Sequence, residues 1–387
     1  MVFDQYLPGS LKETTREKRT KTSTPIHYHV NDNTDIKNVK AFLAHIETKS
    51  ELTEYLAKKI ICHYKDSDKK VLVIHHDTMI SICNLTDVVS MPEMVEGHHT
   101  LEEGDQLVVL NAVDVNHKDP NAKLDIHSVD TDVFILLIGC YPLLPQRTTL
   151  RRNEKEQILI GESYHKLGKK RAEALIGWYA FKGTDNTGTF AGKQLPSHFK
   201  AFMQCDDDTL DAFSVFGLTE KLPPWIMKEM EKYVCLLYRT ATIKSESTKE
   251  LRWLLFAQHG KEGRQLPPTL GTLIPHTERA YFMALVWKAS IKPCPCIPAP
   301  VEYSWKSVDG HLVPVFCTNP PAPEALLQLR RCSCKGSKKN SKAPCSGDRC
   351  GCRKNKMVCT DACECGDGCE NTEEYTLDID DDDQLLV

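Results

Sequence analysis

Short apolar runs and helix-like stretches alternate along the first half of the chain. Residues 69–74, Lys-Lys-Val-Leu-Val-Ile, contain a short continuous apolar run, which is typical of a strand buried on both faces. Before it, residues 48–51 form a capping box, and apolar side chains recur at helical spacing over residues 52–60. After it, the pattern predicts a helix over residues 107–112 and a strand over residues 124–129. This alternation predicts an α/β fold with a mostly parallel sheet and flanking helices, in which ligands bind at the carboxyl ends of the strands.

The apolar pattern changes after residue 205. Helical spacing then dominates up to residue 290, with an amphipathic helix predicted over residues 219–238 and two prolines in its opening turn. Prolines follow in a predicted extended connector, and cysteines and then aspartates come after them. The predicted parts are a domain over residues 1–205, a helical extension over 206–290, a proline-rich linker over 291–327, a small zinc module over 328–372 and an acidic tail over 373–387.

Nine of the seventeen cysteines fall between Cys332 and Cys369. This segment has almost no large apolar side chains, so it cannot bury a core, and either disulfides or metal must hold it together. No secretory signal opens the chain, and nine thiols leave one unpaired in any disulfide scheme. We therefore expect zinc thiolate in a reducing compartment. The predicted zinc ligands are Cys332, Cys334, Cys345, Cys350, Cys352, Cys359, Cys363, Cys365 and Cys369.

The spacing of these cysteines favours a three-metal cluster. A tetrahedral zinc takes four ligands, so nine thiolates fit three ions that share three bridging sulfurs better than they fit two separate sites. This pattern resembles the tesmin-like CXC domain of chromatin proteins. The resemblance includes its last segment, residues 359–371, which reads Cys-Thr-Asp-Ala-Cys-Glu-Cys-Gly-Asp-Gly-Cys-Glu-Asn. The ten-residue gap before Cys345 is longer than that family usually has. The resemblance implies three structural zinc ions and DNA binding.

Basic side chains crowd around the cysteines and are opposed between residues 330 and 356 only by Asp348. Such a surface gains affinity for nucleic acid by neutralising phosphates and releasing counterions. The alternative is that the lysines only balance the negative charge of the metal cluster. We expect DNA as the partner, with RNA left open. The predicted contact residues of the module are Lys335, Lys338, Lys339, Lys342, Arg349, Arg353, Lys354 and Lys356.

Six acidic residues are candidates for a second kind of metal site. Asp130 and Asp132 follow a predicted strand, where side chains two residues apart point the same way. Glu103 and Asp105 stand at a predicted helix start, whose positive end tolerates carboxylates. Any one of these residues is ordinary at a strand end or turn, but together they predict a nest that needs a divalent cation. The full predicted set is Asp4, Glu103, Asp105, Asp130, Asp132 and Asp185.

The order of these acidic motifs resembles the PIN-like nuclease core of the flap endonuclease and XPG family. Residues 2–4 are similar to its Asp-bearing strand, and residues 101–105 to its Glu-Ala-Glu helix start, with two substitutions. Residues 128–132 match its Asp-x-Asp motif, and residues 181–185 match its Gly-x-Asp turn. That family carries a further strand and Asp upstream of the first motif, so we expect a PIN-like domain that is incomplete at its N-terminus.

The resemblance to PIN-like nucleases implies phosphodiester hydrolysis assisted by two Mg²⁺ or Mn²⁺ ions, with the six carboxylates as ligands. It places Arg16, Lys18 and Arg19 on the phosphate backbone. A nuclear nuclease tethered to DNA by the zinc module is the first hypothesis, and a mobile-element origin would suit it. The second is a non-catalytic chromatin protein with a degenerate nuclease core, and the third is an unrelated carboxylate-triad enzyme such as a transposase. The longest apolar run, residues 133–138, is too short to span a bilayer, so no membrane partner is expected.

Overall fold

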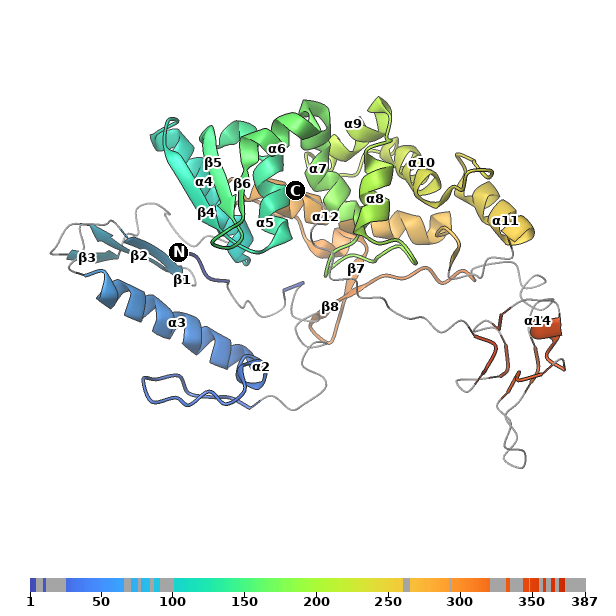
Figure 1. Cartoon of the computed structure of the whole chain (residues 1–387), viewed down its shortest axis with the longest axis horizontal. Helices are drawn as coiled ribbons and strands as arrows, with labels where there is room; N and C mark the ends of the chain where they lie inside the picture. The colour runs from blue at the N-terminus through green and yellow to red at the C-terminus, as the bar shows by residue number, and fades with distance from the viewer. Residues whose placement is uncertain are drawn as a thin grey trace. The chain divides into compact units, whose positions relative to one another are not determined.

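A computed structural model of the chain is shown in Figure 1. It combines helices, which account for about half of the described residues, with short strands in small sheets. Among the helices of the described residues, none has both the length and the apolar character that a bilayer crossing requires. The structure describes residues 1–4, 10–11, 26–65, 71–75, 78–83, 87–90, 101–259, 265–292, 294–320, 332–334, 344–347, 349–354, 358–359, 363–365 and 369–372.

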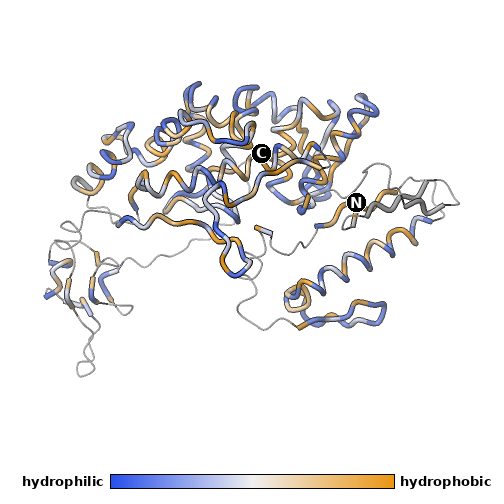
Figure 2. Tube along the Cα trace, turned by 180° about the vertical axis from the view of Figure 1, so that it is seen from behind, coloured by the Kyte–Doolittle hydropathy of each residue, from blue (hydrophilic) through white to orange (hydrophobic). Residues whose placement is uncertain are grey.

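The predicted N-terminal helix is present as α3 (Ile46–His63), which follows the short helix α2 (Val39–Phe42). It begins before the predicted capping box, because the side chain of His45 accepts the N–H of Glu47 and caps the helix. Thr48 is fully buried instead, and its hydroxyl accepts the N–H of Tyr28 at 2.9 Å. Apolar and polar positions alternate along α3 in Figure 2, as expected for an amphipathic helix.

The first sheet has the strand order β1-β2-β3, with β1 (Val71–His75), β2 (Thr78–Cys83) and β3 (Asp87–Ser90). β1 confirms the strand predicted at residues 69–74. The three strands of this sheet pair antiparallel, and only two residues separate β1 from β2. A link this short permits a hairpin but no parallel crossover. The start of the chain lies along β1, where Val2 forms a parallel bridge with Ile74.

The second sheet has the order β4-β5-β6, with β4 (Lys123–His127), β5 (Arg147–Arg151) and β6 (Gln157–Leu159). β4 and β5 are parallel, but β5 and β6 are antiparallel. The sheet is therefore small and mixed, and the prediction of a mostly parallel sheet was wrong. The reason is the tight turn after β5, in which the side chain of Asn153 accepts the N–H groups of Lys155 and Glu156.

The chain packs into two compact units that interleave along the sequence. The first contains α4 (Gly104–Lys118), α5 (Thr131–Gly139), α6 (Ile160–Leu167) and α7 (Lys169–Lys182), and α5 packs against the other three (Figure 1). Residues 133–138 of α5 are all buried, because a helix that is apolar all round needs cover on every side. The units are Met1–Gly188 with Leu210–Pro223 and His276–Val315, and Thr189–Thr209 with Pro224–Pro275 and Phe316–Val387.

Helices α9 (Asp207–Val215) and α12 (Leu270–Ala289) contribute to the core of the first unit. A side chain at Gly177 in α7 would meet the carbonyl oxygen of Phe213 at 2.1 Å, so glycine permits the close approach of α7 and α9. From α12, the buried ring of His276 donates from Nε2 to the carbonyl oxygen of Phe181 at 2.8 Å.

The second unit contains α8 (Leu195–Phe202), α10 (Ile226–Tyr238) and α11 (Thr248–His259). The amphipathic helix predicted over 219–238 exists as α10, but it begins only after the two prolines at 223 and 224, which precede the helix instead of forming its first turn. The phenol of Tyr233 lies 3.0 Å from Nδ1 of His198 inside this unit.

Part of the predicted linker is folded. Within the predicted linker, residues Pro300–Tyr303 form a short 3₁₀ turn, η3. Another short 3₁₀ turn, η1 (Tyr141–Leu143), follows α5. A hairpin of β7 (Trp305–Val308) and β8 (His311–Pro314) follows η3, and Trp305 is buried. The structure differs here from an extended connector, because an aromatic side chain between the prolines gives the segment apolar surface to bury.

Candidate metal centre

All nine cysteines of the C-terminal run lie in one cluster. Six of them are buried, and the other three pack against these from partly buried positions. All nine are free thiols rather than disulfides. The predicted gathering of these cysteines is confirmed, and the cluster is consistent with a zinc module. The buried thiols are Cys332, Cys345, Cys350, Cys352, Cys359 and Cys365, and the partly buried ones are Cys334, Cys363 and Cys369.

The distances between sulfur atoms match those expected for zinc ligands. Sγ of Cys332 lies 3.5 Å from that of Cys345 and 3.7 Å from that of Cys359, and the last two are 3.6 Å apart. A tetrahedron with Zn–S bonds of about 2.3 Å has edges of about 3.8 Å. A disulfide would bring two sulfurs to about 2.05 Å. The thiols are therefore separated as the ligands of a shared metal ion are, and the donor set fits zinc.

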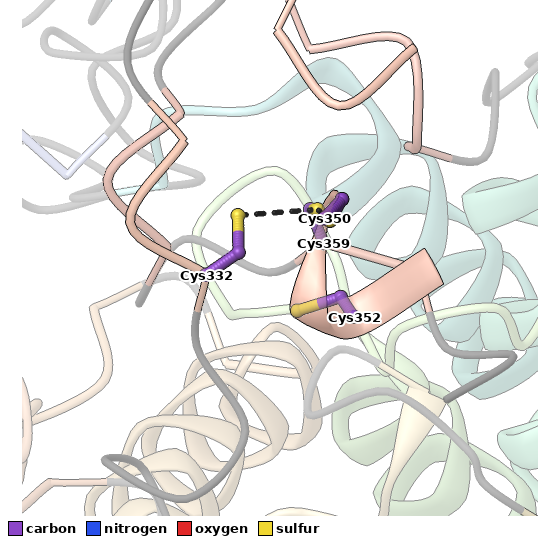
Figure 3. Close-up of side chains that lie close together, drawn as sticks. All are labelled: Cys332, Cys350, Cys352 and Cys359. Carbon is purple, nitrogen blue, oxygen red and sulfur yellow. Dashed lines mark hydrogen bonds between the residues drawn. The ribbon is translucent and has the colours of Figure 1, made fainter. Parts of the chain in front are cut away.

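Three groups of four thiols each have their sulfur atoms within 4.8 Å of one another, and Cys332 belongs to all three. Figure 3 shows one of them, with Cys352 on the single-turn helix α14 (Gly351–Lys354). Because the groups overlap, a thiolate in this cluster can serve more than one metal. The groups are Cys332, Cys350, Cys352 and Cys359; Cys332, Cys345, Cys359 and Cys365; and Cys332, Cys334, Cys345 and Cys350.

Hydrogen bonds from neighbouring residues orient the sulfur atoms. The side-chain amide of Asn371 donates to Sγ of Cys359 at 3.3 Å, and its backbone N–H donates to Sγ of Cys369 at 3.3 Å. The N–H of Arg353 donates to Sγ of Cys350 at 3.5 Å. Such donors outside the ligand set fix ligand geometry and tune metal affinity.

The backbone of the cluster is cross-linked across distant positions. The N–H of Cys359 donates to the carbonyl oxygen of Asn371 at 2.7 Å, and the N–H of Glu364 donates to that of Cys332 at 2.9 Å. Cys345 adopts a left-handed backbone conformation with φ of 65°. A non-glycine residue rarely adopts this conformation without support from its surroundings. The module thus has defined backbone geometry although it lacks an apolar core.

Burial makes most of these thiols reluctant to ionise. It raises the pKa of Cys352 and of Cys365 to about 12, and the neighbouring thiols add to both shifts. For Cys350 burial acts in the same direction but is outweighed by donors that include the N–H groups of Arg353 and Cys352, so its pKa falls to about 6. Several adjacent thiolates therefore require a cation between them.

Three of the predicted nucleic-acid contacts in the module belong to the described residues. Arg349, Arg353 and Lys354 are exposed, and the guanidinium of Arg353 also donates to the carbonyl oxygen of Cys345 at 3.2 Å. The segment beside the cysteines therefore offers basic side chains to solvent. The other predicted contacts lie outside the described residues, namely Arg16, Lys18, Arg19, Lys335, Lys338, Lys339, Lys342 and Lys356.

Three predicted carboxylates gather at the start of α4. Glu103 is the N-cap of this helix in a capping box with Gln106, and Asp105 lies in its first turn. Oδ1 of Asp4 accepts the N–H of Gly104 at 2.7 Å. This brings Asp4 next to the other two across almost a hundred residues of sequence. The positive end of the helix stabilises all three charges.

Asp130 and Asp132 lie at the start of α5 and not at a strand end. β4 ends at His127, Asp130 is the N-cap of α5, and its carboxylate accepts the N–H of Asp132 at 2.9 Å. The extended geometry expected for these two carboxylates was therefore wrong. Oδ1 of Asp132 also accepts the hydroxyl of Tyr179 at 2.7 Å. Nearby, burial lowers the pKa of Lys182, and the charge of Asp132 opposes that shift.

Asp185 lies in the predicted turn, between Thr184 and Thr187, whose hydroxyls bond within the turn. Among the described residues, which include all six predicted carboxylates, no three acidic side chains bring oxygen atoms within 4.8 Å of one another. The structure thus assembles part of the set at α4 and part at α5. A common Mg²⁺ or Mn²⁺ site for the six remains a prediction.

The sequence reasoning missed a second group of metal-ligand type, formed by His27, His29 and Glu51. The available signal was the His-x-His spacing at residues 27–29, with two imidazoles near each other in the chain. What could not be inferred was the facing carboxylate on α3.

Comparisons with known proteins find no match for this chain, whether among family models, curated proteins or solved structures. The resemblances to CXC domains and to PIN-like nucleases therefore rest on the quoted motifs alone. The geometry of the cysteine cluster carries the functional argument.

Proposed function

We propose that residues 328–372 form a three-zinc CXC module that binds DNA in the nucleus. The observation that carries this proposal is the set of three overlapping four-thiol groups, in each of which the sulfur atoms lie within 4.8 Å of one another. Among Cys332, Cys345 and Cys359 the separations are 3.5–3.7 Å. Three zinc ions need twelve ligand positions, and nine thiols fill them when three sulfurs bridge. Cys345, Cys350 and Cys359 each belong to two of the three groups, which supports three bridging sulfurs.

Charge favours nucleic acid over simple compensation of the cluster. Three Zn²⁺ ions and nine thiolates leave a net charge of −3. Residues 330–372 contain ten basic and five acidic side chains, a net charge of +5. This positive charge is larger than the −3 of the metal cluster that it would have to neutralise. All ten basic residues precede residue 357, and four of the five acidic ones follow it. The surplus is small in total but concentrated on one part of the module, where it can meet a phosphate backbone.

The test is DNA affinity as a function of salt. We expect Lys338→Ala with Lys339→Ala and Lys342→Ala to weaken DNA binding and to lower the salt slope by up to about 0.9 for each lost phosphate contact. A matched control removes three exposed lysines elsewhere, Lys228, Lys244 and Lys249. Fluorescence anisotropy of labelled duplex DNA and RNA measures both variants. Equal losses in the two variants would show that only net charge matters and would contradict the proposal.

As a second candidate we propose that the N-terminal region is a PIN-like, metal-dependent nuclease tethered by the zinc module. The supporting observation is the contact of Asp4 with the start of α4, which groups it with Glu103 and Asp105. With Asp130 and Asp132 at the start of α5, these carboxylates would hold Mg²⁺ or Mn²⁺. The bound metal would supply an activated water and stabilise the leaving oxygen.

Mg²⁺-dependent cleavage of branched and single-stranded DNA tests this second candidate. We expect Asp130→Asn with Asp132→Asn to abolish cleavage, because both carboxylates lie at the proposed site. The control is Asp207→Asn with Asp208→Asn, which changes two acidic residues in the first turn of α9. An uncleaved substrate with the parent protein would favour the alternative, a non-catalytic chromatin protein with a degenerate nuclease core.

A further inference from the structure

We propose that His27, His29 and Glu51 bind a divalent transition-metal ion at a site separate from the cysteine cluster. Nε2 of His27 lies 2.8 Å, and Nδ1 of His29 3.4 Å, from the same carboxylate oxygen, Oε1 of Glu51. A tetrahedron with metal–ligand bonds of about 2.0–2.1 Å has edges of about 3.3 Å. The separation of His29 from Glu51 matches this edge, that of His27 from Glu51 is shorter, and all three ligand atoms lie within 4.8 Å of one another, close enough to meet on one ion.

The fold holds these ligands between one loop and one helix. Residues 26–30 lie against α3, where the N–H of Tyr28 donates to the hydroxyl of Thr48 at 2.9 Å. The N–H of Val30 donates to Oε2 of Glu51, also at 2.9 Å. Glu51 thus anchors the segment with one oxygen and presents the other to the histidines. The two histidines are two residues apart, the separation that places side chains on one side of an extended chain.

His27 is also oriented from its second nitrogen. Its Nδ1 lies 3.4 Å from a carboxylate oxygen of Glu47, which is one helical turn before Glu51. Metal-binding histidines usually donate their other ring N–H to a carboxylate, which fixes the tautomer that ligates. The ring of His45 stacks on His27 at 5.1 Å, but its own Nδ1 accepts the N–H of Glu47 and caps the helix.

The donor set indicates the class of metal. Two imidazoles and one carboxylate suit Zn²⁺ and its first-row neighbours better than Mg²⁺ or Ca²⁺, which prefer oxygen ligands. Three protein ligands leave a coordination position for water or for a group on another molecule. The side chain of His29 is 83% exposed, so this position opens to solvent.

A purely structural ion pair is the competing explanation. A pair between His27 and Glu51 would tie the loop to α3 and would account for their 2.8 Å contact. It gives no role to His29, whose exposed ring lies toward the same oxygen at 3.4 Å. The metal site accounts for both histidines.

Zinc titration of the full-length protein, after its cysteines have been saturated with zinc, tests the proposal by calorimetry. We expect the parent to bind one further ion and His29→Ala to bind it at least about tenfold more weakly. Since His29 is largely exposed, its removal leaves folding intact. His63→Ala removes an exposed imidazole from α3, the helix that carries Glu51, and should match the parent. Superimposable isotherms for the parent and His29→Ala would overturn the proposal.

Cobalt spectroscopy separates this site from the cysteine cluster. Co²⁺ added to protein in which only the cysteines carry zinc should give d–d absorption without a thiolate-to-metal charge-transfer band, because the ligands of the proposed site are nitrogen and oxygen. A charge-transfer band would assign the added ion to the cysteines and would also overturn the proposal. The parent, His29→Ala and His63→Ala all carry the same cysteine module. The test of the histidine site is therefore independent of whether that module binds DNA.

Discussion

Helix α5 and the cysteine cluster are both buried, but their side chains are buried for different reasons. In α5, the six residues 133–138 each expose 4% of their surface or less, and all are apolar. In the described part of the cysteine cluster, every buried side chain is a thiol, from Cys350 at 1% to Cys365 at 8%. Burial of apolar side chains stabilises α5, whereas the thiols of the cluster are arranged as the ligands of a bound metal would be.

This difference predicts two separate stabilities within one chain. Burying a large aliphatic side chain contributes about 1.5–3 kcal/mol, and α5 and its neighbours bury many of them. A structural zinc contributes about 10–16 kcal/mol, and almost all of it supports the small module that holds the ligands. Perturbations of metal and of packing should therefore be separable, which the following predictions test from the largest effect to the smallest.

Removal of zinc should unfold the cysteine module and leave the helical core intact. All five tryptophans lie between residues 178 and 305, so tryptophan fluorescence reports on the core and not on the module. After chelation we expect proteolysis within residues 332–372 and an unchanged thermal transition by fluorescence. Readdition of zinc should restore protection. A parallel fall of the fluorescence transition would show that the core depends on the metal.

Loss of a shared thiol should remove more zinc than loss of a peripheral one. Cys332 belongs to all three four-thiol groups, whereas Cys334 belongs to one. We expect Cys332→Ser to lower the zinc content by more than one ion and Cys334→Ser by one at most, measured by elemental analysis. Cys235→Ser, a buried cysteine of α10, is the control and should retain the parent zinc content. Equal zinc loss in the two cluster variants would contradict the bridging arrangement.

A cavity in the core beside α5 should destabilise this core without removing zinc from the cysteine module. Leu137 is fully buried, so Leu137→Ala should lower the free energy of unfolding by about 2–5 kcal/mol while the zinc content stays the same. Urea unfolding followed by tryptophan fluorescence measures this change. Leu218→Ala, at a position 64% exposed, should cost far less. Zinc loss in the Leu137 variant would mean that the two regions fold together.

Acid should weaken the helical core through a buried histidine. Burial lowers the pKa of His276 to about 4, and the charge of Arg279 acts in the same direction against the bond to Phe181. Below pH 6.5 the unfolded chain takes up a proton that the folded chain refuses until about pH 4. Stability from this group is thus complete above pH 6.5 and falls between pH 6.5 and 4, by up to about 3 kcal/mol.

The His276→Gln variant sharpens this test. Glutamine keeps a donor for the carbonyl oxygen of Phe181 but cannot titrate, so urea midpoints measured by fluorescence should vary less between pH 7.5 and 5 than those of the parent. The same pH dependence in the variant and the parent would assign the acid sensitivity to another group.

The two regions also differ in how well the sequence predicted them. The gathering of all nine cysteines was predicted correctly. Thiols that are close in sequence are also close in space, and they are metal ligands whatever secondary structure carries them. The helix start beside Glu103 and Asp105 was also predicted from a local signal, namely acidic residues before an apolar stretch, and α4 begins there. The metal count was predicted from the number and spacing of the thiols and DNA binding from the nearby charges, and both stay predictions.

Sheet direction and carboxylate placement could not be predicted because they depend on tertiary structure. Asp130 caps α5, but an Asp before an apolar run has the same sequence signature at a strand end as at a helix start. The antiparallel pairing of β5 with β6 follows from a turn at Asn153 whose hydrogen bonds are visible only in the structure. Glu51 faces two histidines more than twenty residues away in sequence, which no local pattern reveals.

The smallest predicted effect concerns a residue that holds a ligand without being one. The amide of Asn371 donates to Sγ of Cys359, a thiol shared by two of the four-thiol groups. Asn371→Ala removes this donor but no ligand, so zinc should bind with the same stoichiometry and about tenfold weaker affinity, measured by competition with a chromophoric chelator. Asn121→Ala, in an exposed turn after α4, should leave the affinity unchanged. If Asn371→Ala also leaves it unchanged, sulfur spacing alone sets the affinity of the module, and its hydrogen bonds only shape the backbone. A tenfold loss would instead show that hydrogen bonds from residues outside the ligand set contribute to the affinity of the module for zinc.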